Sequence, residues 1–276
     1  MAVRLMALDL DGTLLDENKH VTPAVKKAVE EAADRGILPV PVTGRPLSGI
    51  PEEVMALPGV HTCITSNGAL CFEDGREKFS AFLQEDIALG IAREAKRRGY
   101  LYSIFADGIG WADEKSHAAL MAHFSNSSLL SYMEASRRPV AEWKTFQKVH
   151  GNRIENVWVR TPEASIADGL EEEIRTAAGK RVSTLRTLPM DVETVSSLAD
   201  KGRAVTRLAE KLGIKREEIL AIGDSPNDIG LLETAGISVA MGNAAKEVKD
   251  ISAYETLDNR HDGAALAIRR FALGEG

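Results

Sequence analysis

Asp9-Leu10-Asp11-Gly12-Thr13-Leu14 follows directly after an apolar run, Leu5-Met6-Ala7-Leu8. Two carboxylates spaced by one residue therefore stand where a buried strand is expected to end. In an open α/β sheet, ligands bind at that end of the strands. If the strand continues through this point, both aspartates point to one side, where they repel each other and favour a divalent cation or a proton. The alternative is a strand followed by an Asp-Gly hairpin turn.

A second pair of carboxylates occurs in Gly223-Asp224-Ser225-Pro226-Asn227-Asp228, again after an apolar run, Ile219-Leu220-Ala221-Ile222. Pro226 suits the first turn of a helix, so these carboxylates also stand at a strand-to-helix junction. Taken alone, the stretch favours a helix N-terminus with capping aspartates.

Two further stretches lie at similar junctions. Pro41-Val42-Thr43-Gly44-Arg45-Pro46 follows the strand expected over 37–42, and by itself it is compatible with a plain turn. Asp200-Lys201-Gly202 opens an amphipathic helix. The helix dipole slightly disfavours a cation in the first turn, which indicates a function for Lys201 rather than a merely solvated lysine.

In this order and at these junctions, the four stretches resemble the haloacid dehalogenase-like phosphohydrolases, and more narrowly their Cof-type branch. Other motifs of that branch are matched by Ser66-Asn67-Gly68-Ala69, by Ala240-Met241-Gly242-Asn243-Ala244, and by Asn259 with Asp262-Gly263. The resemblance extends over nearly the whole chain. Within 82–190 only the general pattern matches, so the resemblance does not identify the substrate.

Length and composition favour two domains and exclude some classes of partner. A chain of 276 residues more naturally forms two domains than one core. The hydrophobic content of 44% is ordinary, and no apolar run is long enough to cross a bilayer. The net charge of −7 argues against a nucleic-acid surface. With no signal peptide at the N-terminus, Cys63 and Cys71 are expected to be reduced thiols in the cytoplasm.

Strands and helices are expected to alternate at both ends of the chain, which predicts an α/β, Rossmann-like core with a parallel sheet and helices on both faces. The expected core strands are 3–8, 37–42, 62–65, 219–222 and 237–240, with helices from Pro23, Lys201 and Pro226 and over 263–273. The expected domains are a catalytic core of 1–81 and 191–276 and an inserted α+β cap of 82–190, which would determine substrate specificity. Expected cap elements are helices 84–98 and 163–177 and strands 101–105, 154–159, 182–185 and 192–195.

The cap sequence carries no strong motif of its own. Asp107-Gly108-Ile109-Gly110 with Trp111 is predicted to be an ordinary hairpin turn rather than a loop that faces the site. His117 and His123 are spaced wrongly for a zinc pair on one helix face. Basic clusters such as Lys96-Arg97-Arg98 and Arg137-Arg138 are predicted to be solvated.

The negative charge of the predicted site indicates that it binds a metal ion. A phosphate dianion that enters near Asp9, Asp224 and Asp228 meets three negative charges. Each pair costs roughly 4 kcal/mol at ~4 Å and an effective dielectric constant near 20. Lys201 alone cannot offset this repulsion, whereas Mg²⁺ with oxygen ligands can. The resemblance assigns the metal to the Asp9 and Asp224 carboxylates and the Asp11 backbone carbonyl, with Asp228 orienting the metal-bound waters.

The resemblance also implies a role for each remaining residue. Asp9 is the expected nucleophile, and Asp11 is the acid that protonates the leaving alcohol and then the base that activates water. Thr43, Lys201 and the backbone at Leu10 and Gly44 are expected to hold the phosphoryl oxygens and neutralise their charge. Asn227 would contact phosphate and Asn67 would shape the entrance. Arg45 would bind a substrate anion or form a salt bridge to the core.

The sequence therefore predicts a Mg²⁺-dependent phosphatase that acts on small phosphorylated metabolites, with sugar phosphates as the expected class. A sugar phosphomutase is the alternative, because relatives move phosphate on the same type of aspartate. A non-catalytic sensor is disfavoured because Asp9, Asp11 and Lys201 are all present, and a dehalogenase because it needs neither Asp11 nor a metal. We expect no nucleic-acid or membrane partner, and a monomer or weak homo-oligomer.

Overall fold

The computed structural model describes residues 2–127 and 129–275, which divide into two compact units. The first unit contains residues up to 44, residues 50–79 and residues from 200 onward. The second contains residues 45–49 and 80–199. Among the described residues, no helix is both long enough and apolar enough to span a membrane.

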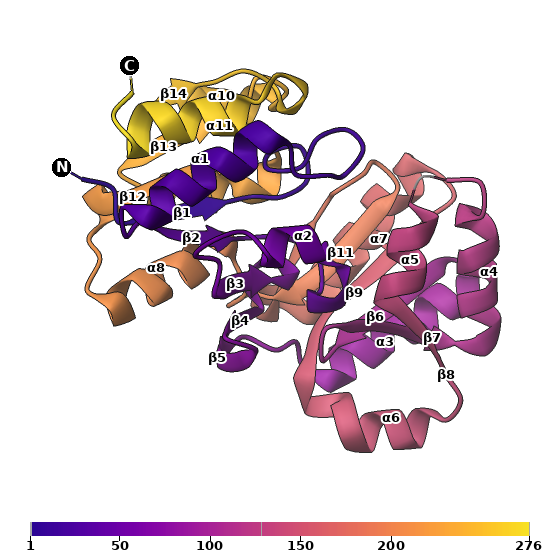
Figure 1. The fold of residues 1–276 in the computed structure, drawn as a ribbon. Helices are drawn as coiled ribbons and strands as arrows, with labels where there is room; N and C mark the ends of the chain where they lie inside the picture. Colours follow the sequence, from indigo (N-terminus) through magenta and orange to yellow (C-terminus); the bar gives the residue numbers. More distant parts are fainter. Residues whose placement is uncertain (1, 128, 276) are drawn as a thin grey trace. The chain divides into compact units, whose positions relative to one another are not determined.

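The first unit is built on a parallel sheet. Its strands are β1 (Leu5–Leu8), β2 (Leu38–Pro41), β12 (Ile219–Gly223), β13 (Ile237–Ala240) and β14 (Tyr254–Glu255). They are ordered β14-β13-β12-β1-β2, and every neighbouring pair is parallel (Figure 1). The predicted parallel core sheet is therefore confirmed.

Helices cover both faces of this sheet. They are α1 (Pro23–Asp34), α2 (Glu52–Met55), α8 (Lys201–Leu212), α9 (Ile229–Thr234), α10 (Lys246–Ile251) and α11 (Gly263–Ala267). In Figure 1, α1 and α11 lie side by side over one face, and α8 lies over the other. The start of α1 follows from its sequence, because the Thr22 hydroxyl accepts a hydrogen bond from the Val25 amide at 3.2 Å and Pro23 occupies the first turn.

A small antiparallel sheet adjoins β2. Its strands, β3 (Thr62–Thr65), β4 (Leu70–Glu73) and β5 (Arg76–Ser80), are joined to β2's end through an isolated bridge between Val42 and Ile64. The strand expected over 62–65 thus forms, but in this sheet. Cys63 and Cys71 lie here as buried free thiols, as predicted. Burial raises the pKa of Cys63 to about 12, so this thiol stays protonated and unreactive.

The second unit is a mixed sheet with helices. Its strands, in spatial order, are β10 (Val182–Leu185), β11 (Asp191–Ser196), β9 (Ile154–Arg160), β6 (Leu101–Ala106), β7 (Ile109–Asp113) and β8 (Arg137–Val140). Its helices are α3 (Glu85–Arg98), α4 (Glu114–Phe124), α5 (Leu130–Ser136), α6 (Trp143–His150) and α7 (Ala164–Ala178). Although the sequence suggested that the core resumes at residue 191, β11 belongs to this unit because it pairs with β9 and β10.

Two predictions for this unit have different outcomes. Asp107 (φ +51°) and Gly108 (φ +76°) form the turn between β6 and β7, which confirms the hairpin. The prediction that Arg137 is solvated is wrong, because Arg137 is only 4% exposed. Its side chain packs against the rings of Phe105, Tyr132 and Trp158, which a local count of charges could not reveal.

Candidate active site

The site lies at the carboxyl ends of three adjacent parallel strands in the first unit. Leu8, at the end of β1, is in register with Ile222 of β12 and with Pro41 of β2. The residues that follow each strand therefore meet at one edge of the sheet. This register brings Asp9, Asp224 and Thr43 together from segments far apart in the chain.

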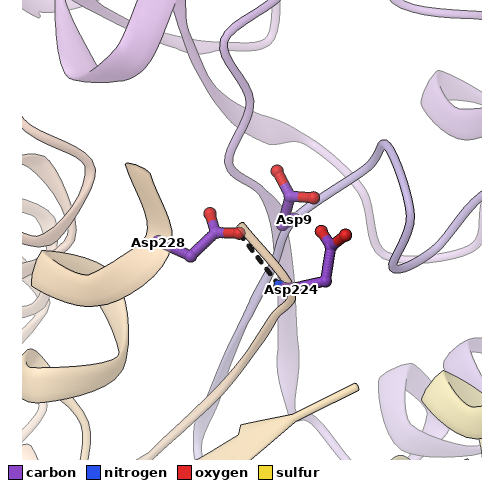
Figure 2. A group of neighbouring side chains, drawn as sticks. All are labelled: Asp9, Asp224 and Asp228. Atoms are coloured by element: carbon purple, nitrogen blue, oxygen red, sulfur yellow. Dashed lines mark hydrogen bonds between the residues drawn. The ribbon is translucent and has the colours of Figure 1, made fainter. Parts of the chain in front are cut away.

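Asp9, Asp224 and Asp228 point toward one another, and one oxygen from each lies within 4.8 Å of the others (Figure 2). Asp9 is 5% exposed and Asp228 is fully buried. Three carboxylates so close and so little hydrated repel one another unless cations lie among them.

Lys201 supplies one of the required positive charges. Its ammonium donates to Asp9 Oδ1 at 2.7 Å and to Asp228 Oδ1 at 2.6 Å, and the residue is 1% exposed. Lys201 is held there as the first residue of α8, which begins where Asp200 accepts a hydrogen bond from the Arg203 amide at 2.8 Å. Burial alone would lower the pKa of Lys201, but the two carboxylates outweigh it and raise that pKa above its ordinary value.

One lysine does not balance three carboxylates. Burial, then the charges of Asp228 and Asp224, raises the pKa of Asp9 well above its ordinary value, although Lys201 lowers it. Burial and the charge of Asp228 raise the pKa of Asp224 to about 6. A divalent cation would remove this repulsion, and a cluster of carboxylate oxygens is the kind of donor set that Mg²⁺ takes. The residues present therefore fit a metal.

Backbone amides fix the orientation of Asp228. Its Oδ2 accepts a hydrogen bond from the Asp224 amide at 3.1 Å (Figure 2). The same oxygen accepts one from the Ser225 amide, also at 3.1 Å. These bonds form because a short 3-10 helix over Pro226–Asp228 follows β12, with Ser225 as its cap. Asp228 Oδ1 accepts from Lys201 and its Oδ2 accepts from the two amides, so this carboxylate is held in one orientation and in turn holds the Lys201 ammonium in place.

Thr13 and Asn243 orient Asp224. The Thr13 hydroxyl donates to Asp224 Oδ1 at 3.3 Å, and Asn243 Nδ2 donates to Asp224 Oδ2 at 3.1 Å and to the Gly12 carbonyl at 2.9 Å. Sequence reasoning matched Asn243 to a motif but gave it no role. Its position after β13, the strand next to β12, was the signal that could have placed it near Asp224.

Gly12 is required by both conformation and space. Its φ is +84°, and a Cβ there would lie 2.3 Å from Asp224 Oδ2. A side chain at this position would displace the Asp224 carboxylate, so glycine is needed for more than the turn itself.

The carboxylate of Asp11 lies outside the acidic group. The strand ends at Leu8 and the chain turns at Gly12, so the strand does not continue through Asp11, as the expectation of a shared side required. The Asp11 side chain is 41% exposed and pairs with Lys19 at 2.9 Å. It is thus accessible to solvent while Asp9 is not.

The predicted phosphate-binding residues are neighbours. Thr43 is 1% exposed, and its carbonyl accepts a hydrogen bond from the Asn67 amide at 3.0 Å. Asn227 Nδ2 donates to Asn67 Oδ1 at 3.0 Å, and a Cβ on Gly44 would lie 3.0 Å from the same oxygen. The Leu10 side chain is fully buried, so only its backbone is compatible with the predicted phosphate contact.

Arg45 packs within the second unit. Its Nη1 donates to the Gly49 carbonyl at 2.8 Å, and its guanidinium carbon lies 5.0 Å from the centre of the Tyr132 ring. The chain therefore changes units directly after Gly44.

Comparisons with known proteins agree with this geometry. A family model described as haloacid dehalogenase-like hydrolase matches residues 6–268. A Bacillus subtilis phosphatase is 29% identical over 280 residues, covering 95% of this chain and 98% of its own. A 5-amino-6-(5-phospho-D-ribitylamino)uracil phosphatase of the same species is 27% identical over 275 residues, covering 98% and 96%.

The fold agrees as well. A solved structure of a haloacid dehalogenase-like hydrolase from B. subtilis matches with a TM-score of 0.81 at 26% identity, covering 97% of this chain and 99% of that one. The resemblance inferred from the motifs is confirmed. The chain belongs to the haloacid dehalogenase-like hydrolase family, in its Cof-type branch, and is a phosphatase.

Proposed function

We propose that the protein hydrolyses phosphate esters of sugars or sugar alcohols, with Mg²⁺ bound, through a phosphoenzyme formed on Asp9. The observation that carries the proposal is the buried Lys201 between Asp9 and Asp228, with Asp224 beside them. Lys201 is fully buried, yet its single positive charge does not balance the three carboxylates around it. Such a site suits the binding of a metal cation together with a phosphate dianion. The relative that acts on a phosphorylated ribityl compound supports a polyhydroxylated substrate.

The metal would be held by the carboxylates of Asp9 and Asp224 and the backbone carbonyl of Asp11, with Asp228 supporting its waters. When bound, Mg²⁺ would neutralise charge on the transferring phosphoryl group. Removal of the carboxylate repulsion would also keep Asp9 ionised at neutral pH, which a nucleophile requires.

Asp9 suits nucleophilic attack because its two oxygens differ. Oδ1 is fixed by Lys201 at 2.7 Å, which leaves Oδ2 to attack phosphorus. The P–O bond to the alcohol breaks as the bond to Asp9 forms, and water later cleaves the aspartyl-phosphate. The split replaces one difficult hydrolysis by two easier steps.

Asp11 suits proton transfer because it is exposed where Asp9 is buried. It would protonate the leaving alcohol in the first step and take a proton from the attacking water in the second. Thr43, Asn227, Asn67 and the backbone at Leu10 and Gly44 would bind the phosphoryl oxygens, with Lys201 near the developing charge.

The second unit would act as the cap that selects the substrate. This unit contains none of the residues assigned above to the reaction or to phosphate binding. Of the sequence motifs, it contains only the end of the stretch 41–46, within the segment 45–49. A cap that closes over the core would exclude water while the phosphoenzyme forms.

The test is a panel of phosphorylated metabolites with Mg²⁺, ranked by kcat/KM, with phosphate release compared with ester loss. We expect release to equal loss and sugar or sugar-alcohol phosphates to rank first. Ester loss without phosphate release would indicate transfer within the molecule and contradict hydrolysis. Residual turnover in Asp9→Asn would contradict the assignment of Asp9 as the nucleophile.

A further inference from the structure

Two sequence motifs noted above have no role in the proposed reaction, the stretch 240–244 and the stretch 259–263. They follow β13 and β14, and the sheet order β14-β13-β12-β1 puts these strands next to the two that precede Asp224 and Asp9. Because all four strands are parallel, the loops after them meet at one edge of the sheet. Both motifs therefore lie beside the candidate active site.

The side-chain amide of Asn243 joins two loops of the site. Its Nδ2 donates to the Gly12 carbonyl at 2.9 Å and to Asp224 Oδ2 at 3.1 Å. An amide nitrogen carries two hydrogens in a rigid plane, so both bonds can form at the same time. Gly12 directly follows Asp11, whose carbonyl would bind the metal together with the Asp224 carboxylate. One planar group therefore fixes the spacing between the two loops that would supply the metal ligands.

Asn259 holds this amide in place. Its backbone N–H donates to Asn243 Oδ1 at 3.1 Å, and its Nδ2 donates to the Leu15 carbonyl at 2.9 Å. The orientation of the Asn243 amide is thus determined, because its nitrogen faces two acceptors and its oxygen faces a donor. Since Leu15 and Gly12 belong to the same loop after β1, the two asparagines close a ring of hydrogen bonds on that loop.

The backbone of these loops is closely packed. The Gly242 amide donates to the Leu257 carbonyl at 3.0 Å, and a Cβ on Gly263 would overlap the same carbonyl oxygen. Asn259 lies between Leu257 and Gly263 in the sequence, so both flanks of its segment are anchored. The backbone N–H that reaches Asn243 is therefore held at a fixed place.

We propose that Asn243 and Asn259 are positioning residues for the metal ion. Asn243 sets the spacing between the Asp224 carboxylate and the backbone that follows Asp11, and Asn259 sets the orientation of Asn243. Both side chains are neutral, so they act through geometry, whereas Lys201 acts through charge. Hydrogen bonds that orient a metal-binding carboxylate typically change metal affinity by about 10–100-fold. The inference rests on the metal site proposed above and adds the residues that pre-organise it.

The test is calorimetric titration of Mg²⁺ into protein first freed of metal, which measures binding without turnover. Asn243→Ala should raise the Kd for Mg²⁺ by about tenfold, and Asn243→Leu, which keeps a side chain of similar size, should do the same. Asn259→Ala should raise it by about threefold, because its backbone N–H still reaches Asn243. The double variant Asn243→Ala/Asn259→Ala should bind Mg²⁺ about as weakly as Asn243→Ala alone, whereas independent effects would multiply to about thirtyfold.

Unfolding in urea without Mg²⁺ separates this role from a structural one. Asn243 is exposed, so its replacement should leave the urea midpoint close to that of wild type. The Mg²⁺ concentration for half-maximal phosphate release should rise with the Kd, and kcat at saturating Mg²⁺ should fall less. Asn152→Ala, which removes an exposed asparagine of the second unit, is the control and should change none of these values. A lower urea midpoint with an unchanged Kd would assign Asn243 to structure alone and overturn the inference.

Failure of the proposed function gives a different result. A wild type that binds no Mg²⁺ in the same titration contradicts the metal assignment, and the role of Asn243 with it. A wild type that binds Mg²⁺ while Asn243→Ala binds it equally tightly overturns the inference alone. A double variant whose loss equals the product of the single losses overturns the dependence of Asn259 on Asn243.

Discussion

Lys201 bridges two carboxylates, those of Asp9 and Asp228, in a buried position. Its contacts with Asp9 and Asp228 are shorter than 3 Å, and none of the three is more than 7% exposed at the side chain. A lysine in this position contributes to both the fold and the reaction, because the same charge satisfies buried aspartates and attracts phosphate.

Lys201→Met should therefore lower both stability and activity. Removal of one partner from a buried ion pair typically costs about 3–5 kcal/mol, because the remaining charges lose their compensation. Phosphate affinity and turnover should also fall, since the ammonium acts on ground-state and transition-state charge. Urea unfolding followed by circular dichroism and kcat/KM measure the two effects. Lys246→Met, which removes an 86%-exposed lysine paired with Asp250, is the control. A change in kcat/KM of less than twofold in Lys201→Met would assign Lys201 to structure alone.

Asp9 and Asp11 should differ in the step that they stop. Asp9→Asn should abolish turnover of every substrate. Asp11→Asn should still form the phosphoenzyme from nitrophenyl phosphate, because nitrophenolate leaves without a proton. Breakdown of the phosphoenzyme should slow by roughly 10²–10⁴-fold without the general base. Rapid mixing should show a burst of nitrophenol and a covalent phosphate on Asp9, with no burst from a sugar phosphate. Equal impairment on both substrates with no trapped phosphate argues against the role of Asp11.

At the scale of the element, Asp113 joins a strand, a helix and a tyrosine. It ends β7, caps α4 by accepting from the Ser116 amide at 3.3 Å, and accepts from the Tyr102 hydroxyl at 2.7 Å. Burial would raise the pKa of Asp113, but the bonds from Tyr102 and Ser116 and the charge of Lys96 outweigh it and lower the pKa to about 2. The folded second unit thus favours the ionised form.

A lowered pKa stabilises the fold above the pKa of the unfolded chain, about 3.9, and this stabilisation is lost as the pH falls toward 2. Asp113→Asn keeps a side chain that can cap α4 but removes the charge. It should therefore be less stable than wild type at pH 7 by about 1 kcal/mol, the difference between a hydrogen bond to a charged acceptor and one to a neutral acceptor, and this difference should vanish near about pH 2. The three tryptophans, Trp111, Trp143 and Trp158, all lie in the second unit, so their fluorescence during urea unfolding reports on it. A stability difference that does not depend on pH would contradict this account.

Local sequence predicted the elements whose ends carry strong signals. Thr22-Pro23 marks the start of α1 and Asp200 that of α8, and both helices form there. The sequence predicts no helix or strand within 114–150, because the structure that these residues adopt depends on contacts with distant parts of the chain. In α4 only Leu120 and Phe124 are buried, and β8 begins with Arg137-Arg138-Pro139, which resembles a turn. Tertiary packing overrides propensity there.

The site was predicted to the extent that strand ends determine it. Asp9, Asp224 and Thr43 could be placed together because each follows a strand of one parallel sheet. The contact of Asn243 with Asp224, the pairing of Asp11 with Lys19 and the burial of Arg137 could not be predicted. Each depends on where a loop or a side chain turns after its element ends, and no periodicity in the sequence encodes that direction.

At the scale of the whole molecule, metal binding should couple to stability. A cation that binds only the folded first unit stabilises it by about 2.7 kcal/mol at a concentration 100 times its Kd. Mg²⁺ should therefore raise the unfolding temperature of the wild type, whereas Asp224→Asn should respond far less. Chelation should abolish phosphate release, and Mg²⁺ should restore it. Ca²⁺ should bind but support turnover poorly, because its looser coordination misaligns nucleophile and phosphorus. Full activity after rigorous metal removal would falsify the metal assignment.

The chain passes between the two units four times, after residues 44, 49, 79 and 199. A domain inserted at one point of the chain has two connections to its host, and recombination could exchange it as one continuous segment. Here a transplanted 80–199 segment would leave residues 45–49 behind, and with them Ser48, whose hydroxyl donates to the Gly108 carbonyl at 2.5 Å. Recombination that exchanges one segment without the other breaks this contact. The two segments are therefore expected to be inherited together and to co-vary among relatives, and functional chimaeras should require both.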